Sequence, residues 1–159
     1  MKESKYGKYI CTDLKTDIKL PDFKGDQVIS GQGYENGVRK SMEHVIWMDS
    51  NVIPGAFYSE IMWCWPTMLK LTREEAKNSR AVPPHSHPFD EIIGYLGTDP
   101  NDPHDLGAEI EFWLEDEQFY LTKSFVVFIP AGMTHCPLRH LRVDRAMFHF
   151  TIGPGQQYT

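Results

Sequence analysis

The residues best suited to chemistry in this sequence lie between His85 and Glu91, in the stretch His-Ser-His-Pro-Phe-Asp-Glu. In an extended chain, side chains two positions apart point to the same side, so His85 and His87 share one face. Pro88-Phe89-Asp90 gives the chain room to turn, so that Glu91 reaches the same point from the strand that follows. Two imidazoles and one carboxylate suit a divalent transition metal such as Fe, Mn, Ni, Zn or Cu. A site of this kind usually has at least one more protein ligand.

The composition indicates one globular domain in the cytoplasm. The chain has 159 residues, of which 41% are hydrophobic and 13% aromatic, so it is long enough to bury a core. A formal charge of −6 argues against nucleic acid or an anionic membrane as partner, because both select basic surfaces. The charged N-terminus does not resemble a signal peptide, and no apolar run has the length of a membrane span. Cys11, Cys64 and Cys136 share no CxxC spacing, so we expect reduced thiols, with Cys136 in the core.

From residue 41 onward, short runs of β-forming residues alternate with turns, which predicts an all-β sandwich or barrel. Residues 1–40 are mixed and polar, and we expect an N-terminal arm or short edge strands there, with the barrel over 41–159. Thr72-Arg73-Glu74-Glu75 has the form of a capping box and predicts one short helix ending near Ser79. The expected loop covers 97–107. The expected strands are 44–48, 56–65, 92–96, 108–114, 117–122, 124–129 and 145–152.

Two motifs in this chain resemble those of the cupin superfamily. The first is His85-x-His87-x-x-x-Glu91, with Gly97 one position earlier than in the family, and the second is Pro130-x-Gly132-x-x-His135. The resemblance covers roughly residues 80–152. Ser79, Ser124 and Arg139 replace two glycines and an asparagine of the family pattern at positions that shape turns. The fold is therefore hardly affected by these departures.

The resemblance implies a small, jelly-roll-like antiparallel β-barrel with one metal ion, held by His85, His87, Glu91 and His135. Cupins with three histidines and one glutamate catalyse dioxygenation, decarboxylation, isomerisation and β-elimination. We therefore expect a metal-dependent enzyme, either a dioxygenase or a non-oxidative lyase or isomerase. Its substrate would be a small carboxylate, enol or catechol-like molecule chelated to the metal. The alternative is a non-catalytic cupin that binds a small molecule for sensing or storage.

Two residues are candidates for proton transfer. Glu91 can serve as a base after leaving the metal, and Tyr95 shares its expected inward face and can donate or accept a proton. The loop at 97–107 is a candidate for substrate specificity, because loops vary most easily.

Several other positions are left open. Either Arg145, Met147 and His149 or Phe148 and Phe150 face inward on the last strand, and the alternation does not decide between them. The basic residues at 139–145 indicate a solvated face or a contact with a substrate carboxylate. Both faces of 56–65 carry apolar side chains, with Trp63 and Trp65 on one of them. A strand that is apolar on both sides fits a barrel covered by a second subunit, so we expect a homodimer.

Overall fold

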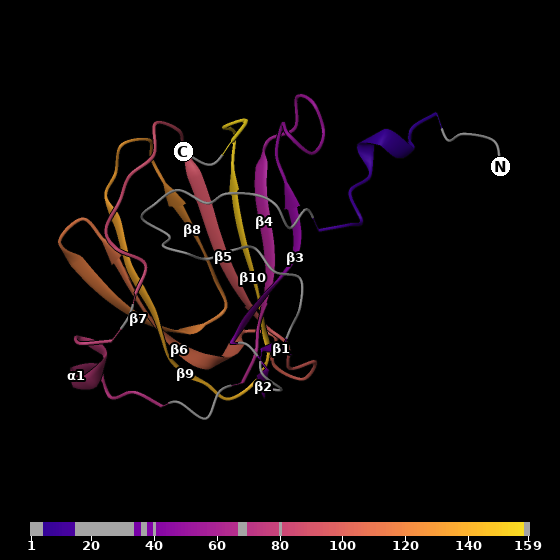
Figure 1. Cartoon of the computed structure of the whole chain (residues 1–159). Helices are drawn as coiled ribbons and strands as arrows, with labels where there is room; N and C mark the ends of the chain where they lie inside the picture. Colours follow the sequence, from indigo (N-terminus) through magenta and orange to yellow (C-terminus); the bar gives the residue numbers. More distant parts are fainter. Residues whose placement is uncertain are drawn as a thin grey trace.

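The computed structural model describes residues 5–14, 34–35, 38–39, 41–66, 70–79 and 81–157. Most of the N-terminal arm expected over 1–40 lies outside these residues. Its described parts are a 3₁₀ helix at Gly7–Tyr9 and two short strands, β1 (Tyr34–Glu35) and β2 (Val38–Arg39), which pair with each other. The rest of the described chain forms two antiparallel sheets that enclose a common interior (Figure 1).

The larger sheet has five strands in the order β3-β4-β10-β5-β8. These strands are β3 (Met42–Met48), β4 (Tyr58–Cys64), β5 (Glu91–Gly97), β8 (Phe125–Ile129) and β10 (Met147–Gly153). The last strand of the chain, β10, lies in the middle of this sheet, paired with both β4 and β5. The sheet is therefore held together by pairings between residues that are far apart in the sequence.

The smaller sheet has three strands in the order β7-β6-β9, namely β6 (Asp105–Leu114), β7 (Glu117–Lys123) and β9 (His135–Val143). One short helix, α1 (Arg73–Ala76), lies near this sheet (Figure 1). Its capping box is formed as expected, because Thr72 Oγ1 accepts from the Glu75 amide and the Glu75 carboxylate accepts from the Thr72 amide.

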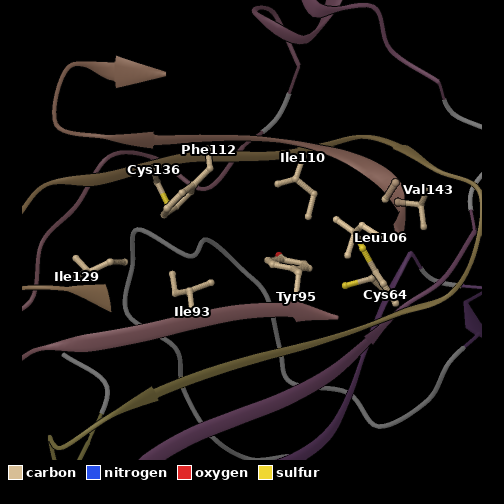
Figure 2. Close-up of a cluster of buried hydrophobic side chains, with 11 residues drawn as sticks. Cys64, Ile93, Tyr95, Leu106, Ile110, Phe112, Ile129, Cys136 and Val143 are labelled. Carbon is tan, nitrogen blue, oxygen red and sulfur yellow. The ribbon is translucent and has the colours of Figure 1, made fainter. Parts of the chain in front are cut away.

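A hydrophobic core fills the space between the two sheets. Figure 2 shows Ile93 and Tyr95 of β5 facing Ile110 and Phe112 of β6 across this space. Cys136 belongs to the same core and is 5% exposed, which confirms its expected place as a core thiol. Burying an aliphatic or aromatic side chain of this size contributes about 1.5–3 kcal/mol, so these contacts fix the distance between the sheets.

The structure confirms the all-β architecture and most of the expected strands, including the hairpin of β6 and β7. It corrects three details. β9 was not expected from the sequence, the helix ends at Ala76 rather than near Ser79, and the loop is shorter than 97–107 because β5 extends to Gly97 and β6 begins at Asp105. Among the described residues, no helix is long and apolar enough to cross a membrane.

Candidate metal centre

The two sequence motifs meet through hydrogen bonds of the backbone. The His85 amide donates to the His135 carbonyl at 3.1 Å, and the His135 amide donates to the His85 carbonyl at 2.9 Å. The Gly132 amide, in the turn before His135, donates to the His87 carbonyl at 2.8 Å. The stretch before β5 is thus joined to β9 by two isolated antiparallel bridges, Val82 with Leu138 and His85 with His135, rather than by a long ladder. The second of these bridges sets the spacing between the ligands of the first motif and that of the second.

Three histidine side chains converge at this junction. The nitrogens of His85, His87 and His135 that can bind a metal all lie within 4.8 Å of one another. Glu91, the first residue of β5, points to the same place: its Oε2 lies 3.1 Å from His135 Nε2 and 3.7 Å from His87 Nε2. His87, Glu91 and His135 are each at most 3% exposed. The structure thus brings together all four residues that the sequence and the resemblance assign to the metal.

The donor atoms of this cluster fit a bound cation. Both carboxylate oxygens of Glu91 and the Nε2 of His135 are buried without a hydrogen-bond partner in the described part of the chain. A buried polar atom without a partner costs about 1–3 kcal/mol, and more if it is charged. A divalent cation satisfies such atoms, and three imidazole nitrogens with one carboxylate suit a transition metal of intermediate softness.

Second hydrogen bonds orient two of the histidines. The Nδ1–H of His85 donates to the Pro83 carbonyl at 2.8 Å, and that of His135 donates to the Met133 carbonyl at 3.3 Å. Donation from Nδ1 leaves the lone pair on Nε2, the arrangement usual for metal-binding histidines. Burial lowers the pKa of His85 to about 4, and the hydrogen bond to Pro83 only partly opposes this effect. His85 is therefore neutral at pH 7, as a metal ligand must be.

Tyr95, the second candidate for proton transfer, lies deeper in the barrel than the cluster. It points inward, as expected, but it follows Glu91 by four residues, about 13 Å along β5. Its ring belongs to the hydrophobic core, and its hydroxyl lies 3.0 Å from His140 Nε2. Burial raises the pKa of Tyr95 well above 10, so its hydroxyl stays protonated at neutral pH. Its catalytic role stays a prediction.

The structure decides which face of the last strand is interior. Met147, His149 and Thr151 are buried at 5% exposure or less, and they alternate with Phe148 and Phe150. The His149 ring stacks on Tyr95 with 4.1 Å between centroids, and its Nδ1 lies 3.0 Å from the Gly94 carbonyl oxygen. The interior of the five-stranded sheet therefore carries polar groups well beyond the metal ligands.

Sequence reasoning missed one of these groups, the carboxylate of Glu60. It is 2% exposed on the interior face of β4, accepts a hydrogen bond from Tyr58 Oη at 2.7 Å, and contacts His44 Nε2 on β3. The only signal in the sequence was its place in alternation with Met62 and Cys64, and the equally apolar opposite face obscured it.

The loop considered for specificity lies at the other end of β5. It begins after Gly97, about 20 Å along the strand from Glu91. Only glycine allows β6 to start so close to this end, because a Cβ at Gly97 would lie 2.0 Å from the Asp105 carbonyl oxygen. Arg145 Nη2 binds the Asp105 carboxylate there at 2.6 Å. The described structure therefore does not place this loop beside the histidines.

The other basic residues of 139–145 are also paired within the chain. Arg139 Nη1 donates to Glu111 at 3.0 Å, and Arg142 forms an ion pair with Asp144. These arginines thus contact carboxylates of the protein itself.

Two antiparallel sheets face each other, and the two motifs meet where β5 and β9 begin, with their histidines and glutamate turned to one point. This is the arrangement that the resemblance of the two motifs to those of cupins predicts.

Comparison with solved structures finds several that are similar to this chain at low sequence identity. An RmlC-like cupin from Shewanella frigidimarina has 9% identity and a TM-score of 0.40, over 73% of this chain and 77% of that one. A predicted oxalate decarboxylase from Thermotoga maritima has 17% identity and a TM-score of 0.43, over 70% and 77%. The DMSP lyase DddQ from Ruegeria pomeroyi has 20% identity and a TM-score of 0.37, over 66% of this chain but only 41% of the lyase. No family model and no curated protein sequence matches the chain. These likenesses concern the fold alone.

Proposed function

We propose that this protein is a metal-dependent enzyme that acts on a small, oxygen-rich molecule at a centre formed by His85, His87, Glu91 and His135. The observation that carries the proposal is the convergence of three imidazoles, two of them buried, with a buried carboxylate whose oxygens have no hydrogen-bond partner in the described chain. A divalent transition metal bound there would act as a Lewis acid toward a chelating carboxylate, enol or catecholate, and a redox-active one would also allow chemistry with O₂.

The protein's own residues have separate tasks in this proposal. The three histidines are neutral ligands, so the centre keeps a net positive charge that attracts an anionic substrate. Glu91 is the proposed base: its carboxylate is buried and close to two of the histidines, so a small displacement would free one oxygen to take a proton. The nearby apolar core keeps bulk water away from this carboxylate, which strengthens its electrostatic interactions.

The test combines elemental analysis with a substrate screen. We expect about one transition-metal ion per chain in protein purified without a metal-affinity tag, as one four-ligand site requires. Catechols, enols and hydroxy acids are then incubated with the metal-loaded protein in air and under strict anaerobiosis. Product formation only in air identifies a dioxygenase, and turnover without oxygen identifies a lyase or isomerase. Protein that binds no transition metal would refute the proposal.

The position of Tyr95 favours a second candidate, a cupin that binds a small ligand for sensing without converting it. Tyr95 is enclosed in the core and paired with His140, so Glu91 is left as the one proposed proton carrier at the cluster. A binding protein would show saturable thermal stabilisation by a ligand that is recovered unchanged, whereas an enzyme would consume it.

We also propose that the protein forms a homodimer in the cytoplasm. The outer face of the five-stranded sheet exposes apolar side chains from three adjacent strands, namely Ile92, Leu96, Val126, Phe128 and Ile152. Exposed apolar groups on neighbouring strands are typical of a protein interface. A second copy is the favoured occupant, because two chains of charge −6 repel unless they meet through a face poor in charge.

A further inference from the structure

His87, the second histidine of the cluster, has a stacked aromatic neighbour. The ring of His87 is stacked on Phe89, with 5.0 Å between centroids and 10° between planes. His85 and His135 donate hydrogen bonds from Nδ1 to backbone carbonyls. A nearly parallel, offset stack of this geometry contributes about 0.5–1.5 kcal/mol beyond the burial of area. Phe89 therefore limits the rotation of the His87 ring.

Phe89 is itself held by two glycines at the end of β10. A Cβ at Gly153 would lie 2.7 Å from Phe89 Cε2, and a Cβ at Gly155 would lie 2.8 Å from Phe89 Cδ1 and Cε1. The glycines thus contact opposite edges of the same ring. Real Cβ atoms do not approach other heavy atoms so closely, so any other residue at either position would push the ring away. We call Gly153 and Gly155 the glycine seat.

Both sides of this contact are anchored to other parts of the barrel. The Gly155 carbonyl accepts a hydrogen bond from the Tyr58 amide at 2.7 Å, which ties the glycine seat to the start of β4. On the other side, the Asp90 carboxylate accepts from the Ala131 amide at 2.9 Å, which ties the residue after Phe89 to the second motif. The glycine seat and the backbone next to Phe89 are therefore held by separate hydrogen bonds.

We propose that Phe89, held in the glycine seat, is a positioning residue that keeps the ring of His87 in the orientation for metal binding. The inference rests on the metal centre proposed above. A ligand fixed before the metal arrives loses little conformational entropy on binding, so the metal binds more tightly than it would to a freely rotating histidine. The role differs from simple packing because it concerns the metal-binding geometry and not only the stability of the fold.

The experiment measures Co²⁺ binding to the full-length protein by visible absorption, with a competing chelator to obtain Kd. Four proteins are compared with the wild type: Phe89→Ala, Gly153→Ala, the double variant, and Phe57→Ala as a control at a phenylalanine that is 61% exposed. We expect Phe89→Ala to weaken Co²⁺ binding by about 10-fold or more and to change the absorption bands, as removal of a group that orients a ligand does. The control should bind as the wild type does.

Gly153→Ala tests the glycine seat from the opposite side. Its methyl group should displace the ring and weaken binding by a similar factor, but it should add little once the ring is absent in the double variant. Additive effects of the two substitutions would overturn the proposal.

The remaining outcomes separate the inference from the metal centre itself. A wild type that binds no Co²⁺ would refute the metal centre. If the wild type and Phe89→Ala bind Co²⁺ equally well, the role of Phe89 is refuted but the metal centre is not. Thermal unfolding of the metal-free proteins completes the test. A loss of stability in Phe89→Ala with unchanged absorption bands would show packing only and would also overturn the inference.

Discussion

The two sheets of this barrel differ in how many polar side chains they bury and how many apolar ones they expose. The three-stranded sheet turns Leu106, Ile110 and Phe112 inward, and on its other face Glu111 pairs with Arg139. The five-stranded sheet also turns apolar side chains such as Ile93 and Tyr95 inward, but it adds polar groups among them and exposes apolar side chains on its outer face. Its inward polar side chains include Glu60, Glu91, His149 and Thr151, and its exposed apolar ones include Ile92, Leu96, Val126, Phe128 and Ile152.

This difference indicates a division of tasks between the sheets. Apart from His135, the three-stranded sheet contributes mainly apolar side chains to the core, and it buries the ion pair of Glu111 and Arg139 on its other face. The five-stranded sheet carries polar groups that cost free energy when buried, which is expected where chemistry rather than stability selects the residues. Its apolar outer face is the one that would suit a second copy of the chain.

The largest expected effect concerns the point where the two sheets meet. His135 is the only proposed ligand on the three-stranded sheet, so His135→Ala should lower the metal content from about one ion per chain to less than a tenth of that. The measurement is elemental analysis after dialysis, with His104→Ala, an exposed loop histidine, as control. Retention of full metal by His135→Ala would show that the four-ligand assignment is wrong.

A pair of buried glutamates tests the division of tasks directly. Glu111→Ala removes the partner of the half-buried Arg139, so we expect the free energy of unfolding to fall by about 3 kcal/mol with metal binding unchanged. Glu91→Gln should do the reverse: it should lose metal, while the stability of the metal-free protein changes by less than about 1 kcal/mol. Urea denaturation and metal titration of both variants provide the comparison. Equal losses of stability would contradict the division.

The pH dependence of stability tests the polar interior between the sheets. Burial lowers the pKa of His140 to about 4, and its Nε2 lies 3.0 Å from the Tyr95 hydroxyl. Because this pKa lies below the unfolded value of about 6.5, the neutral form is favoured by folding, and stability is lost as pH falls from 6.5 toward 4. We expect His140 to account for a loss of about 2 kcal/mol between pH 7 and pH 5. His140→Gln should remove this part of the slope, and identical slopes in both proteins would count against it.

The smallest effect on the fold and the metal is expected at the outer face of the five-stranded sheet. Phe128→Lys places a charge among exposed apolar side chains, so it should convert a dimer into a monomer while metal content stays the same. Light scattering after size-exclusion chromatography measures the mass, with the exposed Thr122→Lys on the other sheet as control. A monomeric wild type would remove the basis for a dimer.

Where the pattern is local, sequence reasoning selected residues that the structure does bring together. His85, His87 and Glu91 follow from the two-residue period of extended chain, and the structure brings them together. His135 could be assigned only through the resemblance of its motif, because the bridge to His85 spans a large sequence separation. Its strand was missed because Pro137 and two arginines interrupt the apolar pattern of β9.

Other features depend on information that alternation does not contain. The alternation of side chains along a strand tells which face a side chain lies on, but not how far along the strand it lies. Tyr95 was therefore correctly predicted to point inward, while its distance from Glu91 along β5 was overlooked. The inward face of β4 could not be chosen, because both of its faces carry apolar groups. Which face of β4 points inward is determined by its pairing with β10, which lies at the far end of the sequence.

The antiparallel bridge between His85 and His135 also links the site to the folding reaction. It joins residues about fifty positions apart, and closing a loop of that length costs about 3.5 kcal/mol of chain entropy at 25 °C. We therefore expect the ligands to come together after the strands between them have formed, at a late stage of folding. Amide hydrogen exchange should reflect this order. The two amides that form the bridge should exchange together, and a metal that binds only the closed form should slow both by the same factor.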